Sequence, residues 1–162
     1  MQQKHGKDIN FMQLAIFEAH KAEKLGEVPV GSVLVGPDGE LISKGHNLKE
    51  NLPSALGHAE LITVHRASKK LGKWRLSDCT LYVTLEPCLM CTGALVQARL
   101  GRLVFGAHDP KAGAVESLYQ AATDKRLNHQ MEITSGVLQQ ECSEILKSFF
   151  KRRRSENKAS RK

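Results

Sequence analysis

The sequence predicts an α/β fold in which helices cover a central sheet of about five strands. The first observation is that short β-branched and aliphatic runs alternate with segments whose apolar residues recur at helical spacing. The second is length, because 162 residues are enough for one domain, 1–162, with its own core. The third is composition: 41% hydrophobic and 25% charged residues are ordinary for a globular protein, and no apolar run approaches a membrane span.

Each element follows from local signals. Asp8 is expected to cap a first helix, in which Met12 and Ala15 face the core and which Gly26 ends. A Pro-Asp-Gly turn at 37–39 then joins two strands into a hairpin. Pro87 suits the start of a later helix. The expected order is a helix over 8–25, strands over 28–35 and 41–44, a helix over 58–70, a strand over 79–85, a helix over 88–99, a strand over 103–105, a short helix over 115–122, a strand over 131–134, and a final helix from Leu138.

Positive charge is concentrated at the C-terminal end. Residues 147–162 contain eight Lys or Arg residues and one acid, so this helix end and tail account for the whole net charge of +7. A basic arm on a neutral body is typical of proteins that contact phosphate backbones. A solvated, frayed tail would have the same composition.

The chemistry is concentrated around Pro87-Cys88 and Cys91. A strand ends just before this segment, and a helix that opens at Cys88 puts both sulfurs on one face, a turn apart. Two thiolates there can bind one metal ion, and a helix N-terminus favours their negative charge. His58 begins the preceding helix and is the candidate third ligand.

One imidazole and two thiolates favour zinc and leave its fourth position open for water, which is typical of a catalytic site. Glu60 lies in the same helical turn as His58, beside that water, where its carboxylate can act as a general base and then as a general acid.

Two other interpretations of these residues remain open. A Pro-Cys-x-x-Cys segment also occurs in thioredoxin-type redox pairs, which need neither His58 nor Glu60. A structural zinc site would need a fourth protein ligand, and Cys79 and Cys142 are the remaining cysteines. Both lie in apolar segments, so we expect them to be buried small hydrophobic residues.

The combination of His58-Ala59-Glu60 with Pro87-Cys88 and Cys91 resembles the motif of the zinc-dependent nucleoside and nucleobase deaminases. Within that superfamily the chain closely resembles the bacterial tRNA-specific adenosine deaminases, from about Phe11 to Arg154. The other matching segments are Glu27-Val28-Pro29-Val30-Gly31, Gly45-His46-Asn47, Trp74-Arg75-Leu76, Val104-Phe105-Gly106-Ala107, Lys111, Gly113-Ala114, Asn128-His129 and Phe149-Phe150.

The resemblance implies a three-layer α/β/α sandwich of the cytidine-deaminase-like type with a mixed sheet. It implies hydrolysis of an amidine C–N bond that converts adenosine to inosine at the wobble position of a tRNA anticodon, usually of an arginine tRNA. It also implies a homodimer with one zinc ion per subunit. The residues implied are His58, Cys88 and Cys91 for zinc, Glu60 for proton transfer, Asn47, Val28, Val30 and Ala59 for the adenine, and Asp109, Lys111, Phe149, Arg152 and Arg153 for the anticodon loop.

Two other functions remain open. A deaminase of free guanine, cytosine or deoxycytidylate would share the zinc chemistry but would not need a basic arm. A non-enzymatic, zinc-stabilised RNA-binding module would need the metal ligands but not Glu60. The N-terminus lacks the apolar core of a signal peptide, so we expect a cytoplasmic protein.

Overall fold

A five-stranded mixed sheet lies at the centre of the computed structural model, which describes residues 2–161. The strand order is β2-β1-β3-β4-β5. β1 is antiparallel to both β2 and β3, whereas β3, β4 and β5 are parallel. The elements are α1 (Gln2–Lys24), β1 (Gly31–Val35), β2 (Leu41–His46), α2 (Ala59–Leu71), β3 (Thr80–Leu85), α3 (Leu89–Gln97), β4 (Arg102–Ala107), the 3-10 helix η1 (Ala121–Thr123), β5 (Glu132–Ser135) and α4 (Gln139–Ala159).

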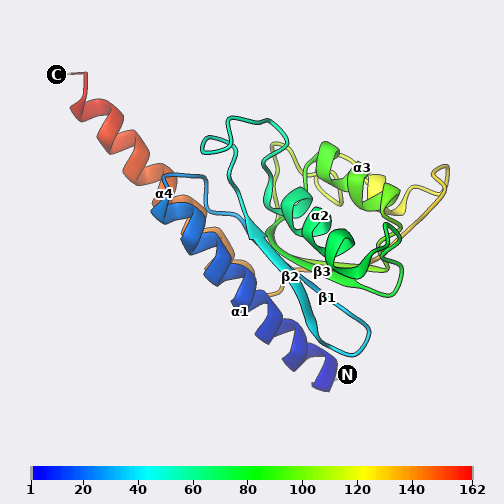
Figure 1. The fold of residues 1–162 in the computed structure, drawn as a ribbon. Coiled ribbons are helices and arrows are strands. Elements are labelled where there is room, and N and C mark those ends of the chain that lie inside the picture. The colour runs from blue at the N-terminus through cyan, green and yellow to red at the C-terminus, as the bar shows by residue number, and fades with distance from the viewer. Residues whose placement is uncertain (1, 162) are drawn as a thin grey trace.

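Helices cover both faces of the sheet, with α1 and α4 on one face and α2 and α3 on the other (Figure 1). Alternating side chains of the strands build a separate core on each face. In β4, Leu103 and Phe105 belong to the core beneath α2 and α3, whereas Val104 packs toward α1 and α4. The predicted three-layer α/β/α sandwich is therefore confirmed.

α1 approaches the sheet most closely at Gly31. A side chain at Gly31 would collide with the backbone of α1 at Ala15 and Ala19. Met12 and Ala15 are fully buried, as the helical spacing predicts. The tight contact fixes α1 against the first strand of the sheet.

The prediction that Asp8 caps the first helix is wrong, because α1 begins at Gln2 and Asp8 lies within it. Asp8 is buried instead, and its carboxylate accepts bonds from the Arg102 guanidinium at 2.7 and 2.8 Å and from the Tyr82 hydroxyl at 2.8 Å. Burial alone would raise the pKa of Asp8, but the bonds from Arg102 and Tyr82 lower it below its usual value. Asp8 therefore links the helix to β3 and β4.

Two further boundaries differ from the prediction. The prediction of a helix over 115–122 is wrong, because this stretch consists of turns followed by η1. The backbone N–H groups of Val115, Glu116 and Ser117 bind the carboxylate of Glu86 instead of helical carbonyl groups. The strand expected from Val28 begins three residues later, at Gly31.

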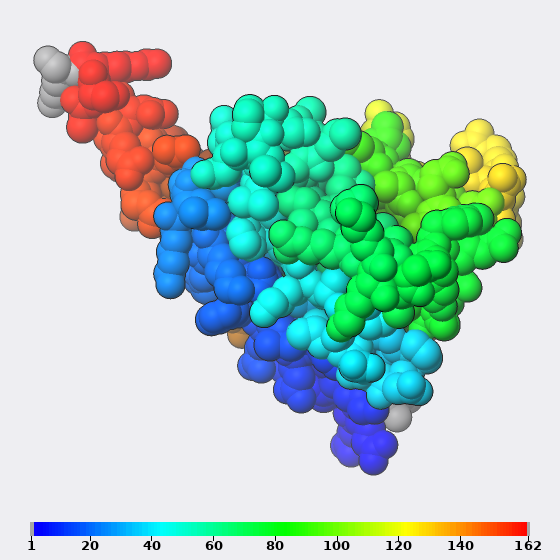
Figure 2. All heavy atoms as spheres, viewed as in Figure 1, coloured from blue at the N-terminus to red at the C-terminus, as the bar shows by residue number. Residues whose placement is uncertain are grey.

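The last helix carries the basic C-terminal segment. α4 continues to Ala159, and its end projects beyond the body of the molecule (Figure 2). Where α4 leaves the body, Arg152 forms a 3.0 Å ion pair with Glu23, and Arg153 donates to the carbonyl of Gly26 at 3.2 Å. Within residues 2–161, no helix is long and apolar enough to span a membrane.

Candidate active site

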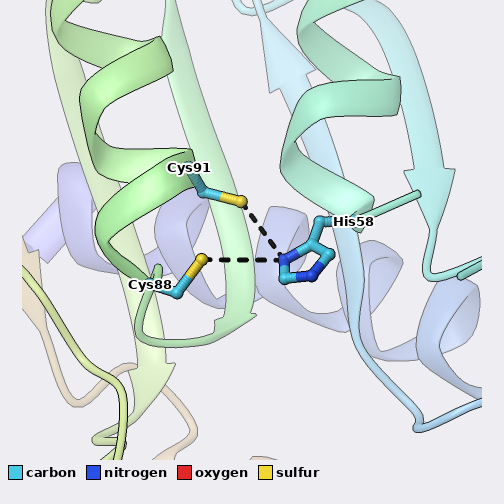
Figure 3. A group of neighbouring side chains, drawn as sticks. All are labelled: His58, Cys88 and Cys91. Atoms are coloured by element: carbon cyan, nitrogen blue, oxygen red, sulfur yellow. Dashed lines mark hydrogen bonds between the residues drawn. The ribbon is translucent and has the colours of Figure 1, made fainter. Parts of the chain in front are cut away.

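The candidate metal ligands lie at the starts of two helices. His58 is the N-cap residue of α2 and Cys88 is the N-cap residue of α3. Both have extended backbone conformations, and neither side chain makes a capping hydrogen bond. Their side chains are therefore free to point toward each other across the gap between the two helices (Figure 3).

The three predicted ligands converge. His58 Nδ1 lies 3.7 Å from Cys88 Sγ and 3.4 Å from Cys91 Sγ, and the three ligand atoms lie within 4.8 Å of one another (Figure 3). Ligand atoms at these separations can reach one central ion. An imidazole nitrogen with two sulfurs is a donor set that fits a tetrahedral metal, with one position left for another ligand. These residues are therefore arranged as a candidate metal site.

Among the three candidate ligands, the electrostatics of Cys88 suit a cation. Hydrogen bonds from Cys91 and then from His58 lower the pKa of the Cys88 thiol to about 4, which favours its thiolate form. The hydrogen bond to Cys88 raises the pKa of His58. The hydrogen bond between Cys91 and Cys88, together with burial, raises the pKa of the Cys91 thiol.

Glu60 lies beside the metal ligands in the first turn of α2. Its side chain is buried, and its Oε2 accepts a bond from the Cys91 thiol at 3.3 Å. Burial raises the pKa of Glu60, which favours a carboxyl group that can both take up and release a proton.

A pocket of about 210 Å³ opens onto this group. Asn47 is one of its walls, and its amide makes two bonds: Nδ2 donates to the carbonyl of Val28 at 3.1 Å, and Oδ1 accepts from the backbone N–H of Lys49 at 3.1 Å. One N–H and one oxygen lone pair of Asn47 remain available. The candidate site residues that line the pocket are Val28, Val30, Asn47, His58, Ala59, Glu60, Cys88 and Asp109.

The other candidate RNA contacts lie outside this pocket. Lys111 lines a neighbouring hollow between the loop after β4 and α4, and Arg153 lines a second hollow beside Asn47. Phe149 is buried at 3% exposure, with the guanidinium groups of Arg152 and Arg153 over its ring. Its neighbour Phe150 is the exposed aromatic residue, at 44%.

Sequence reasoning missed the role of Glu86. Its buried carboxylate accepts backbone bonds from Asp109, Glu116 and Ser117, and it lies directly before the Pro-Cys segment. Burial alone would raise the pKa of Glu86, but these hydrogen bonds lower it to about 2. A signal was present, because a charged residue directly follows a mainly apolar strand.

Glu27 was also missed, and it organises the loop 48–57, in which the sequence shows no motif. The Glu27 side chain is buried, and its Oε1 accepts the backbone N–H groups of Glu50 at 2.8 Å and Asn51 at 2.7 Å. The Asn51 amide adds a third bond to the same oxygen. The start of this loop is thus fixed next to the pocket wall formed by Asn47.

The fold and the metal site together indicate a deaminase, and the comparison with known families agrees. Residues 7–154 match the MafB19-like deaminase family. The protein is therefore a deaminase, in which a His-x-Glu segment and a Pro-Cys-x-x-Cys segment meet at two helix starts.

Comparison with individual proteins identifies the narrower family. The chain is 50% identical over 155 residues to the tRNA-specific adenosine deaminase of Bacillus subtilis (strain 168), covering 96% of both proteins. A solved structure from a study of A-to-I editing by tRNA:A34 deaminases at the wobble position of transfer RNA is 43% identical, with a TM-score of 0.81 over 85% of this chain and 99% of that one. A guanine deaminase from Bacillus subtilis is 35% identical, with a TM-score of 0.58 over 61% of this chain and 63% of that one. The chain belongs to the tRNA-specific adenosine deaminases.

Proposed function

We propose that this protein hydrolyses adenosine to inosine at the wobble position of a tRNA anticodon, with zinc as its metal and Glu60 as its proton-transfer group. The observation that carries the proposal is a nucleobase-sized pocket that opens onto the metal ligands and Glu60 together. A basic helix borders the same face of the molecule, which suits a base that is part of an RNA chain.

The donor set supports zinc over other metals, because two sulfur ligands and one imidazole are typical of zinc sites. When bound, zinc supplies the Lewis acidity that activates a water molecule for attack on C6 of the adenine. His58, Cys88 and Cys91 would hold the ion, and three protein ligands would leave one position of a four-coordinate ion for that water.

Glu60 moves the protons. Its carboxylate takes a proton from the attacking water and delivers it to N1 of the ring. It then takes the remaining proton of that water, from the hydroxyl group now on C6, and transfers it to the departing amine. The reaction consumes one water molecule and releases ammonia. The backbone N–H of Ala59, at the first position of α2, has no helical acceptor, and Ala59 lines the pocket. This N–H can therefore stabilise negative charge on the reacting base.

The pocket walls orient the base. The free N–H and the free lone pair of Asn47 suit the donor and acceptor edge of adenine, while its two existing bonds hold the amide rigidly. Val28 and Val30 provide apolar contact with the faces of the ring. Asn47 thus holds the local backbone and contacts the substrate with the same side chain.

The anticodon loop lies over the hollows on either side of Val28. Asp109 and Lys111 contact it from the loop after β4, and Arg152 and Arg153 contact phosphates from α4. Phe149 supports these arginines from beneath, since its ring is buried under both guanidinium groups. The basic end of α4 extends the phosphate-binding surface outward.

The remaining features of the proposal concern assembly and location. We propose one catalytic domain over 1–162, with 147–162 as its basic arm, and a homodimer that covers exposed apolar side chains such as Leu118 and Tyr119. The substrate is an arginine tRNA, as the family resemblance implies. A tRNA substrate and a site of reduced thiols both fit the cytoplasm.

The decisive assay measures inosine formation on an anticodon stem-loop with adenosine at the wobble position. Free adenosine, guanine, cytosine and deoxycytidylate are measured in parallel, together with a stem-loop whose only adenosine lies elsewhere in the loop. Turnover of the wobble stem-loop alone supports the proposal. Turnover of a free base or nucleotide instead would refute it.

The phosphate contacts are tested by salt dependence. Replacing Arg152 and Arg153 with alanine should reduce the slope of log binding constant against log salt by about two, one for each phosphate contact. Lys69, which is exposed near the end of α2, is the control, and its alanine variant should leave the slope unchanged.

A further inference from the structure

We infer that Glu86 is a positioning residue that couples the metal ligand Cys88 to the loop 109–117, which forms the outer wall of the pocket. The inference rests on the proposed function for its substrate. Glu86 does not face the reacting atoms, because its carboxylate is directed into the loop behind the pocket wall.

The backbone beside Glu86 joins the metal site to this loop. Cys88 pairs with Gly113 in an isolated antiparallel bridge, and the carbonyl of Pro87 accepts the N–H of Ala114 at 2.9 Å. The N–H of Glu86 itself donates to the carbonyl of Ala107 at 2.8 Å, at the end of β4. The segment that carries the cysteine and the loop that walls the pocket are therefore hydrogen-bonded along their backbones.

The carboxylate fastens the two ends of the loop. One oxygen accepts the backbone N–H of Asp109 at 3.1 Å, near the start of the loop. The other accepts the N–H groups of Val115 at 3.1 Å, Glu116 at 2.9 Å and Ser117 at 3.0 Å, near its end. The Ser117 hydroxyl completes the set by donating to the first oxygen.

Two details show that the site is built around a carboxylate. All five donors are uncharged, and across residues 2–161 no Lys, Arg or His side chain forms a salt bridge with Glu86. Four backbone N–H groups and one hydroxyl group therefore compensate the buried charge. Gly113 lies directly against the carboxylate, and any side chain there would overlap it. The loop 109–117 therefore packs closely around the carboxylate of Glu86.

The consequence concerns substrate placement. Asp109 and Ala112, from this loop, line the pocket. If the carboxylate is lost, buried N–H groups such as that of Val115 lose their acceptor, and the loop must move to find others. The pocket wall then shifts relative to Cys88, although the three metal ligands themselves are unchanged.

The test is the variant Glu86→Gln, which keeps the size of the side chain but points an NH₂ group at backbone donors. Zinc content, melting temperature, amide hydrogen exchange of 109–117, and kcat and KM on the wobble stem-loop are measured well below the melting temperature. We expect one zinc ion per chain, faster exchange confined to 109–117, and a loss in kcat/KM of roughly 10- to 100-fold. The control Glu40→Gln removes one carboxylate charge from the exposed turn between β1 and β2, which is not part of the loop 109–117, so it should match the wild type.

The outcomes separate the inference from the proposed function. Wild-type protein that does not act on the stem-loop refutes the proposed function. If the wild type is active and the Glu86→Gln variant has the same kcat and KM, the inference is overturned but the proposed function stands. This holds even if the melting temperature of the variant falls. Should Glu86→Gln fail to fold, Ser117→Ala decides, since it removes one of the five donors. A smaller loss in kcat/KM supports the inference, and unchanged kinetics overturn it.

Discussion

Replacing Glu60 with glutamine tests the chemistry most directly. The variant keeps the shape of a buried side chain but cannot carry a proton between water and the base. General acid–base catalysis by one side chain contributes roughly 10²–10⁴-fold, which corresponds to about 3–5 kcal/mol of transition-state stabilisation. Glu60 handles two proton transfers in the proposed reaction, so we expect a loss at the upper end of this range.

The two other carboxylates that line the pocket accept hydrogen bonds from backbone groups. Glu86 and Asp109 also line the pocket, but the oxygens of Glu86 are occupied by five donors, and Asp109 Oδ1 accepts the backbone N–H groups of Lys111 at 3.0 Å and Ala112 at 3.2 Å. The rate that remains in Glu60→Gln therefore reflects binding and the metal alone.

The assay is single-turnover inosine formation on the wobble stem-loop, with zinc content and melting temperature measured on the same preparation. Glu40→Gln, an exposed substitution in the turn between β1 and β2, is the control for the loss of one charge. A folded, metal-loaded Glu60→Gln protein that retains full activity would show that Glu60 is not the proton carrier. A protein in which wild type and variant are equally inactive would instead favour the non-enzymatic RNA-binding module.

Three further predictions concern the metal and the fold. Cys88→Ser should bind less than one zinc ion per chain by atomic absorption and should lose activity, because one of three protein ligands is removed; full zinc occupancy would contradict this ligand set. Asp8→Asn should lower the free energy of unfolding by about 3 kcal/mol at neutral pH, because it breaks a buried ion pair with Arg102. Since the pKa of Asp8 is lowered in the fold, its contribution is present above about pH 4 and is lost as the pH falls through the folded value, so urea unfolding of wild type and variant should converge at low pH. Gly31→Ala should cost at least about 1–3 kcal/mol by thermal or urea unfolding, because its methyl group meets the backbone of α1; an unchanged midpoint would show that this contact is loose.

Much of the fold and the metal group was predictable from local sequence. Apolar periodicity indicated four long helices and the strands, because each element buries one face and the pattern repeats within it. The metal group was predictable because Pro87 starts a helix and spacing alone puts Cys88 and Cys91 on one side of its first turn. His58 followed from the need for a third ligand.

The parts that sequence reasoning missed depend on contacts between distant segments. The segment 115–117 was predicted to be helical because its local pattern is helical. Its N–H groups instead donate to the carboxylate of Glu86, about thirty residues earlier in the chain. Asp8 read as a helix cap because Asp favours that position, yet its partner Arg102 comes from the fourth strand. Local propensity cannot show a hydrogen-bond partner that only the fold brings near.

The identity of the two N-cap residues has a consequence for how this protein can evolve. Ser, Thr, Asp and Asn stabilise a helix start by about 1 kcal/mol, and α2 and α3 begin instead with His58 and Cys88, which make no capping bond. The chain thus gives up helix stability at two places in return for metal ligands. In metal-free protein, His58→Ser should raise the melting temperature while destroying the site, so selection for thermal stability alone would erode catalysis first at these positions.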